Sequence, residues 1–424
     1  MSTIADEVAA LRGTKPATFK DLLTHPAFSK LLAAQTISSL GDWVGFVAVA
    51  ALVNRLGGNV GAYAVAGVMV ARMLPAILFG PVAGALVDRM DRKRMMMTAD
   101  ISRGLLYATM PFLGKLWLIF LVSFLIECLS LLWSPSRDAS LPNLVPRRQL
   151  ANANSLGLVT TYGTLPLGGL IFAFLAGGSD LIPALSGNPE ALPLLLDGGT
   201  FAFSAFMLSR ITFPPPAAHK VERLDLSRVG KDIAEGVRFL REDSLASAMT
   251  LGIVVAFSAV GAVLAIGPIF ATDTLVAGNT GWGILVTSFG VGMGIGLALS
   301  NKAADLIDRE SVFVWSLIAA AGALFVLAAM PNIQLASVIT VILGVFCGSA
   351  WASGYVLLQE NVQDEFRGRT FGALTVLSRL GLFLSLAAFP ILAGIVGARE
   401  AFIVDQRIDL SGTRVALWVA GASD

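Results

Sequence analysis

The sequence predicts an all-α integral membrane protein in which one helical bundle occurs twice along the chain. Three observations support this fold class. Hydrophobic residues make up 55% of the 424 residues and charged residues only 14%, whereas an ordinary soluble domain is roughly 25% charged. Apolar runs of bilayer length follow one another almost end to end, and a charged turn recurs at half the chain length. With a mean hydropathy of +0.76, this composition excludes a soluble enzyme.

The apolar runs define the expected helices in order. A bilayer core of about 30 Å requires about 20 apolar residues in a helix. The sequence offers eleven such spans, at residues 30–54, 62–87, 95–113, 116–136, 151–176, 192–212, 245–270, 280–300, 312–330, 333–358 and 370–397. After Gly412 one apolar stretch remains, from Val415 to Ala422. We expect the last helix to be short or truncated, since eleven spans would leave the second bundle one helix short.

The recurring turn lies between the second and third spans of each half. Its two copies read DRMDR and DLIDR, and their first residues are 217 positions apart. A tight turn with fixed charges between two spanning helices must lie in water, so its recurrence indicates a duplicated bundle. The residues of this charged motif, for which the family resemblance given below implies a gating role, are Gly84, Asp88, Arg89, Asp91, Arg92, Asp305, Asp308 and Arg309.

The distribution of positive charge predicts the topology. The loops on the side of the N-terminus hold 22 Lys and Arg residues, and the opposite loops hold four, Arg55, Lys115, Arg399 and Arg407. This bias places the N-terminus in the cytoplasm of a multi-pass cell-membrane protein. We expect a cytoplasmic segment at 1–27, a six-helix bundle at 28–212, a linker at 213–244 and a second bundle at 245–424. Apolar positions at helical spacing predict an amphipathic helix in the linker, although a simple connector is an equal alternative.

Charged residues inside the spans are the strongest candidates for function, because they are costly in a bilayer and usually mark ion or substrate paths. In the first half, Asp42, Arg72 and Glu127 lie near mid-span. A carboxylate beside an arginine stays ionised and a lone one takes a proton, so this trio predicts proton coupling. Alternatively, Arg72 forms a static ion pair with one acid, or Glu127 contacts substrate. In the second half, Arg379 either attracts substrate or snorkels to the cytoplasm.

Other chemistry has no support in the sequence. The two histidines lie in polar segments, and HExxH, CxxC, Walker and GxSxG motifs are absent. We therefore expect no enzyme activity, no metal, no cofactor and no nucleic-acid partner.

Several motifs resemble the major facilitator superfamily, and in particular its macrolide-efflux and enterobactin-exporter branch. GALVDRMDRKR at 84–94 is similar to the superfamily signature, with Asp91 in place of the usual second glycine. SLGDW at 39–43, DISR at 100–103 and LPNLVP at 141–146 also match. The resemblance covers roughly residues 28–420, and it implies two six-helix bundles around a central cavity.

The resemblance also implies roles for particular residues. The acid at Asp88 would latch the two halves against the N-terminus of the eleventh helix, where the helix dipole favours negative charge, and Asp100 with Arg103 would extend this charge relay. The segment YGTLPLGG resembles an antiporter motif that allows close helix packing; its characteristic residues are Gly163, Pro166, Gly168 and Gly169. Trp43, Tyr162 and Arg379 are candidates for the substrate cavity.

These features predict a secondary active transporter. The expected activity is proton-coupled efflux of a small amphipathic compound, such as an antibiotic, dye or siderophore, by a monomer in contact with membrane lipid. The alternatives are an uncoupled or importing carrier, a lipid flippase of the same fold, or a membrane sensor that does not transport.

Overall fold

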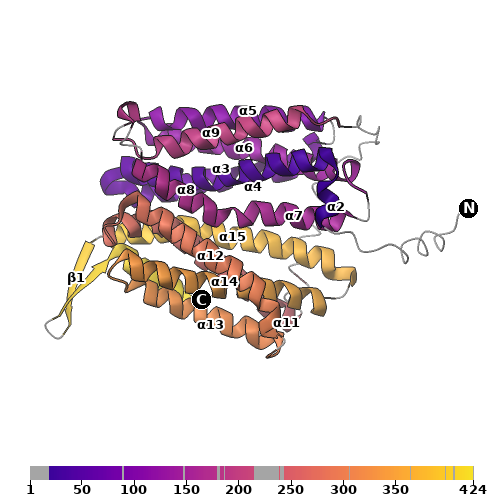
Figure 1. The fold of residues 1–424 in the computed structure, drawn as a ribbon. Coiled ribbons are helices and arrows are strands. Elements are labelled where there is room, and N and C mark those ends of the chain that lie inside the picture. Colours follow the sequence, from indigo (N-terminus) through magenta and orange to yellow (C-terminus); the bar gives the residue numbers. More distant parts are fainter. Residues whose placement is uncertain are drawn as a thin grey trace, which may run out of the picture.

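The structure, a computed structural model, describes residues 19–87, 90–146, 149–178, 182–185, 187–213, 238, 243–304, 306–362, 364–396, 398–403 and 406–423. Two groups of helices run side by side in it (Figure 1). The predicted linker lies almost entirely outside the described residues, as do Asp88, Arg89 and Asp305.

The first group begins with a short helix and continues with the spanning helices of the first half. Its members are α2 (Phe19–Leu23), α3 (Pro26–Gly57), η1 (Gly58–Val60), α4 (Gly61–Val87), α5 (Arg92–Thr109), η2 (Met110–Phe112), α6 (Leu116–Ser140), η3 (Leu141–Asn143), α7 (Leu150–Gly163), α8 (Leu165–Gly178), η6 (Pro183–Leu185) and α9 (Ala191–Ser209). The fifth predicted span is therefore two helices, α7 and α8, which meet at Thr164 just before Pro166.

The second group repeats this pattern. Its members are α11 (Ser244–Ile269), the π-helical turn η7 (Phe270–Thr274), α12 (Gly278–Ala304), α13 (Arg309–Ala328), α14 (Ile333–Asn361), α15 (Asp364–Val396), the strands β1 (Ala398–Ile403) and β2 (Gln406–Ser411), and α16 (Gly412–Ser423). The predicted short last helix is α16, which packs on α11, α13 and α15.

The described helices confirm the predicted fold class and a multi-pass membrane protein. Nine segments of the described chain are long and apolar enough to cross a membrane, and the first of them, Pro26–Phe79, contains α3 and most of α4. These segments cover ten of the eleven expected spans. The remaining one falls in α5, whose charged side chains, including Asp100 and Arg103, lower its hydropathy.

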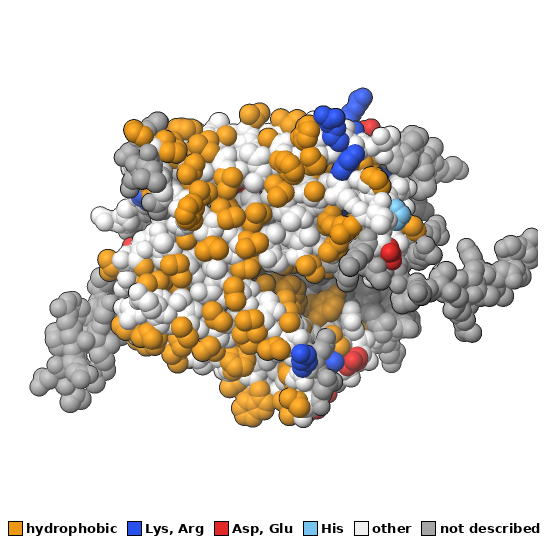
Figure 2. All heavy atoms as spheres, in the orientation of Figure 1, with side chains coloured by type: hydrophobic (Ala, Val, Ile, Leu, Met, Phe, Trp, Pro, Cys, Tyr) orange, Lys and Arg blue, Asp and Glu red, His pale blue; other side chains and the backbone are white. Residues whose placement is uncertain are grey.

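The β-hairpin was not predicted. Its strands pair antiparallel from Ala398 with Ser411 to Ile403 with Gln406, and they project from one end of the molecule (Figure 1). We call this the hairpin end. The opposite end, which holds α2 and the connections after α4 and α12, is called the basic end. On the face shown in Figure 2, most of the Lys and Arg side chains lie toward this basic end.

Contacts between the two groups close the hairpin end. The Nδ2 of Asn54 donates to the Oγ1 of Thr272 at 3.2 Å. The indole N–H of the fully buried Trp282 donates to the carbonyl oxygen of Val47 at 3.3 Å. A Cβ added to Gly169 would lie 2.8 Å from the carbonyl oxygen of Gly283, so α8 and α12 touch through bare backbone here.

A cluster of polar side chains also helps to close the hairpin end. Glu190, whose side chain is fully buried, forms an ion pair with Arg55 at 2.7 Å. The other oxygen of this carboxylate accepts from the Nδ2 of Asn279 in the second group at 2.8 Å. Arg55 also donates to the side chain of Asn188 at 2.8 Å. Among these contacts, only the hydrogen bond from Asn279 joins the Arg55–Glu190 ion pair to the second half.

Candidate functional site

A cavity of about 650 Å³ lies between the two groups. It extends from the middle of the helices toward the basic end, where a hollow separates the two groups in Figure 2. The wall from the first half is polar and charged, and the described residues of the opposite wall are Leu264, Leu382 and Leu386. Among the described residues, six charged side chains line the cavity, and these six lie in the first half: Asp42, Arg72, Arg103, Glu127, Arg137 and Asp138.

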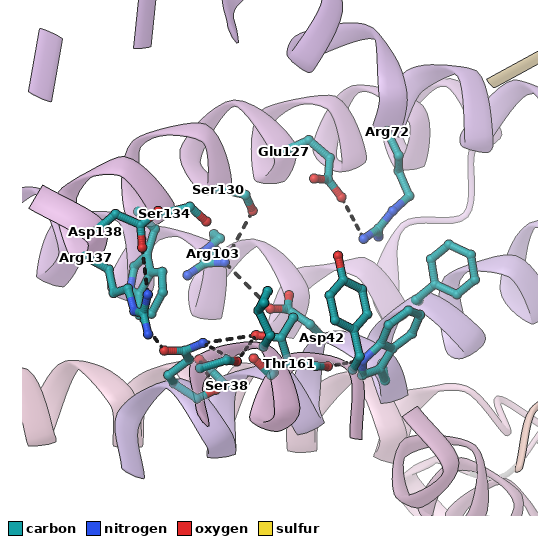
Figure 3. Close-up of a pocket in the computed structure, with 18 of the residues that line it drawn as sticks. Ser38, Asp42, Arg72, Arg103, Glu127, Ser130, Ser134, Arg137, Asp138 and Thr161 are labelled. Atoms are coloured by element: carbon teal, nitrogen blue, oxygen red, sulfur yellow. Dashed lines mark hydrogen bonds and ion pairs between the residues drawn. The ribbon is translucent and has the colours of Figure 1, made fainter. Parts of the chain in front are cut away.

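Arg72 and Glu127 form an ion pair at the deeper end of the cavity. The Nη2 of Arg72 lies 2.7 Å from the Oε1 of Glu127 (Figure 3), and its Nη1 donates to the hydroxyl of Tyr107 at 3.2 Å. Arg72 is 8% exposed, with its guanidinium 5.4 Å from the ring centre of Phe46. Two of the three residues predicted for proton coupling are therefore direct partners, joining α4 to α6.

Asp42, the third predicted coupling residue, faces a different arginine. Its Oδ2 lies 3.9 Å from the Nη1 of Arg103, and 39% of its side chain is exposed to the cavity. The main partner of Arg103 is Asp100, one turn earlier on α5, at 2.5 Å. Asp42 is thus accessible and only loosely paired (Figure 3).

Asp100 and Arg103 form a buried network. The Oδ2 of Asp100 accepts from the hydroxyl of Ser204 at 2.6 Å and from the indole of Trp133 at 3.2 Å. Arg103 lies 4.2 Å above the ring of Phe201. Because a buried charge is stable only when it is paired and hydrogen-bonded, this network fixes the guanidinium beside the cavity. Arg103 thereby links Asp100 to Asp42, whereas Asp88, to which the predicted relay would lead, lies outside the described residues.

A third arginine, which the sequence analysis did not single out, lies near the cavity mouth. Arg137 donates to the side-chain oxygen of Gln35 at 3.1 Å and pairs with Asp138 at 2.7 Å. Gln35 in turn donates to Thr161 at 3.0 Å. A Cβ on Gly157 would lie 2.1 Å from the Nη2 of Arg137, so a glycine leaves room for this side chain.

The predicted aromatic residues both line the cavity. Trp43 donates through its indole to the carbonyl oxygen of Thr161 at 2.8 Å, which fixes α3 against α7. Tyr162 meets the ring of Trp351 from the second half edge to face, with centroids 5.8 Å apart. Arg379, by contrast, is exposed and is not among the residues that line the cavity.

The residues of the predicted helix-packing motif lie at the junction of α7 and α8. Gly163 ends α7 and Pro166 lies in the first turn of α8. A Cβ on Gly168 would come within 2.5 Å of the Cβ of Trp43, and Gly169 contacts α12 as described above. This junction therefore packs against α3 within the first half and against α12 of the second half.

The gating motif is only partly described. Asp91 caps α5 by accepting from the N–H of Arg94 at 2.8 Å, and Arg92 donates to the carbonyl oxygen of Ala139 at 2.7 Å. Gly84 lies within α4 and Arg309 begins α13. Asp308 caps α13, where it accepts from the N–H and the hydroxyl of Ser311, both at 2.7 Å. The contacts of Asp91 and Asp308 are helix caps, and that of Arg92 joins α5 to α6.

The sequence analysis missed Asp197, a fully buried acid on α9. The signal was present, because Asp197 interrupts the predicted span 192–212 just as Asp42 interrupts its own. It also missed Glu190, which lies at the start of a helix and gave no such signal.

This fold, with a central cavity and an ion-pair cluster inside the spans, defines a membrane transporter of the major facilitator type. The chain belongs to the family described as transmembrane secretion effector, whose model matches residues 18–401.

Three relatives illustrate the family. An uncharacterized MFS-type transporter of Bacillus subtilis, YfiS, is 28% identical over 384 residues, covering 88% of each chain. The putative bacilysin exporter BacE of Bacillus subtilis is 26% identical, covering 88% of this chain and 91% of its own. Macrolide efflux protein A of Streptococcus pyogenes is 24% identical, covering 81% of this chain and 82% of its own.

Solved structures share the fold at low sequence identity. A bacterial homologue of the human lysosomal transporter Spinster, in an inward-facing and unoccupied conformation, has a TM-score of 0.71 at 16% identity, over 87% of this chain and 83% of that one. A D-xylose-proton symporter has a TM-score of 0.67 at 13% identity, over 93% and 94%.

Proposed function

We propose that the protein is a secondary active exporter that moves small amphipathic compounds out of the cell by alternating access, driven by protons. The observation that carries this proposal is the cluster of Asp42, Arg103, Arg72 and Glu127 on one wall of a drug-sized cavity. Such a cluster changes its protonation when its surroundings alternate between wet and dry, because charges are stable in water and costly in an apolar closed site.

Asp42 is the best candidate for the proton carrier. Arg103 is already paired with Asp100 at 2.5 Å, so Asp42 at 3.9 Å gains little from it. Glu127 has a close partner in Arg72 at 2.7 Å, and it contributes either a second proton site or a contact to the substrate. The asymmetry between a tight and a loose pair supports different roles for the two acids.

The cavity supports an amphipathic substrate class. Its volume of about 650 Å³ falls within the range of about 300–1,000 Å³ typical of small-molecule sites. A compound with a polar side and an apolar side would place the first against the charged wall and the second against Leu264, Leu382 and Leu386. The names of two relatives, a putative bacilysin exporter and a macrolide efflux protein, favour antibiotic-like compounds.

The side of the membrane to which the cavity opens follows from the proposed topology. With the N-terminus in the cytoplasm, the basic end is cytoplasmic and the cavity opens inward. We further propose that the protein works as a monomer in the cell membrane, where the gating motif holds the basic end in its closed state.

Proton release from inverted vesicles tests this function. Acidified vesicles containing the chain would be monitored with a pH-quenched dye while macrolides, cationic dyes and catecholate siderophores are added in turn. We expect one class to restore fluorescence, and this response to disappear in Asp42→Asn and to weaken or disappear in Glu127→Gln. Asp21→Asn and Glu310→Gln, at two exposed acids that do not line the cavity, are matched controls.

Each other outcome points to an alternative. Compound uptake without proton release would identify an uncoupled carrier, and flux of labelled lipid alone would identify a flippase. A folded and inserted chain that moves none of these compounds would contradict the proposal and favour a sensor.

A further inference from the structure

A second acid lies behind Asp42, on the side of α3 that faces α9. Asp197 is fully buried. A Cβ added to Gly41 would lie 2.4 Å from one of its carboxyl oxygens, and a Cβ on Gly45 would lie 2.0 Å from the other. The carboxyl group therefore rests against the backbone of Gly41 and Gly45, which flank Asp42 on α3. A side chain at either position would enter the space that the carboxyl group occupies.

The hydrogen bonds of Asp197 do not suit a permanent charge. Its Oδ2 has no hydrogen-bond partner among the described residues. Its Oδ1 faces the hydroxyl of Thr200 at 3.3 Å, but that hydroxyl has one proton and lies closer, at 2.7 Å, to the backbone carbonyl of Asp197 itself. A buried carboxylate without donors is unfavourable, whereas the neutral acid is tolerated. In this conformation the pocket therefore suits the protonated form.

The charged and titratable groups that face Asp197 come from the neighbouring helices. They are Asp42 on α3, Arg72 on α4, and Arg103 and Tyr107 on α5. The ring of Tyr107 lies beside the carboxyl group of Asp197, because its Cε1 is 2.9 Å from the same Cβ position on Gly45. Both arginines have closer acidic partners, Glu127 at 2.7 Å and Asp100 at 2.5 Å. A change in this pairing would supply Asp197 with a counter-charge.

We propose that Asp197 is a second proton-binding site, which holds a proton behind Asp42 while the cavity is open to the basic end and releases it when the halves rock. This inference rests on the proposed proton coupling. In the step, the O–H bond of Asp197 breaks and its proton leaves the protein, either directly through water admitted beside α3 or by way of the carboxylate of Asp42 once that group has released its own proton. An arginine compensates the carboxylate that remains. The contact between α3 and α9 thus becomes part of the coupling machinery.

The number of protons taken up with the conformational change tests this site. The full chain, with Cys128→Ser and Cys347→Ser, would carry labels at the exposed positions Val60→Cys and Gln334→Cys on the two halves at the hairpin end. Distance measurements in lipid nanodiscs across pH would give the ratio of open to closed states. By linkage, the slope of its logarithm against pH is the number of protons exchanged.

We expect a wild-type slope above one, lowered by up to one in Asp197→Asn and, separately, in Asp42→Asn. The control Asp21→Asn should keep the wild-type slope. A wild-type slope in Asp197→Asn would overturn the inference, because the proton would then stay in place throughout the cycle. A lowered slope in Asp197→Asn with no change in Asp42→Asn would support Asp197 while removing Asp42 from the proposed function. Unchanged slopes in both would overturn both proposals.

A second variant and a second measurement test the inference if Asp197→Asn fails to fold. Asp197→Ser fits the same glycine-lined space and should lower the slope in the same way. The second measurement uses the labelled chain that keeps Asp197. Its infrared C=O stretching band of a buried carboxylic acid should disappear over the pH range in which the distances between the labels change. A band that persists through the conformational change would contradict the inference.

Discussion

At the scale of single residues, each cavity arginine is held by a defined set of partners. Arg72 has Glu127 and Tyr107, Arg103 has Asp100, and Arg137 has Gln35 and Asp138. Guanidinium groups remain charged under all ordinary conditions, so in the proposed coupling the acids would be the groups that change state. Among the acids that pair with these arginines, Asp42 has the longest distance, 3.9 Å, and is therefore the best candidate to exchange a proton.

The cap of α13 gives a prediction of pH dependence. Hydrogen bonds from the backbone N–H and the hydroxyl of Ser311 hold the pKa of Asp308 below its ordinary value of 3.8. A lowered folded-state pKa stabilises the protein above the unfolded value, and this contribution is lost as the pH falls through the folded value. We therefore expect Asp308→Ala to lower the melting temperature by a constant amount near neutral pH and by progressively less below about pH 3.8.

Thermal melting of the purified chain in detergent, from about pH 3 to about pH 7, checks this prediction. Asp308→Asn is the matched control, because asparagine caps helices well without titrating. A difference between the wild type and Asp308→Ala that does not shrink in acid would show that the charged cap has no role in the stability of α13.

At the scale of helices, the closure of the hairpin end depends on polar side chains at helix ends. Glu190 precedes α9, Arg55 lies in the last turn of α3, and Asn279 lies in the first turn of α12. Such contacts suit a reversible closure, since water replaces each partner when the helices separate. The buried Trp282 adds both apolar area and a hydrogen bond to the backbone of α3.

We predict that Asn279→Ala opens the hairpin end. The substitution removes a hydrogen bond to a buried carboxylate, and such bonds contribute about 1.5–3 kcal/mol, so the ratio of open to closed states should rise by about tenfold or more. Distances between labels at Val60 and Gln334 measure this ratio. Asn361→Ala, at the basic end, is the matched control, and an equal response in both variants would contradict a specific role for Asn279.

The sequence predicted the helices far better than the contacts between them. Spans follow from length and hydropathy, and a pairing of Arg72 with one of the two acids, Asp42 or Glu127, was among the predicted alternatives. The pairing of Asp42 with Arg103 was not predicted, because spanning helices are apolar on all sides and their periodicity does not show which faces meet. Asp197 was overlooked for a related reason: its setting depends on Gly41 and Gly45, which lie in another helix more than 150 residues away.

Irregular elements were also difficult to predict. The break at Thr164 between α7 and α8 falls inside a run that hydropathy treats as continuous. The β-hairpin lies between α15 and α16, in a stretch that the sequence analysis read only as a loop. Both features depend on local backbone hydrogen bonding, which hydropathy does not report.

At the scale of the whole molecule, the two halves are joined at the hairpin end and separated by the cavity toward the basic end. Alternating access requires the contacts at the hairpin end to break in each cycle. Asn54 and Thr272 lie on opposite sides of this contact, 3.2 Å apart through their side chains.

We therefore predict that linking these positions stops transport. A short cleavable crosslinker between Asn54→Cys and Thr272→Cys, in a chain without Cys128 and Cys347, should abolish transport of the compound identified in the vesicle assay. Cleavage of the linker should restore it. A single-cysteine chain treated in the same way is the control, and transport that continues in the crosslinked chain would exclude rocking about the hairpin end.

The division of the cavity into a charged wall and an apolar wall has a consequence for evolution. The described charged residues of the cavity belong to the first half, and Leu264, Leu382 and Leu386 belong to the second. Substitutions among leucines change shape without leaving a charge unpaired. If the first half couples protons as proposed, cargo preference can drift in the second half without affecting the coupling residues. Changes in substrate range should then arise first through substitutions on α11 and α15.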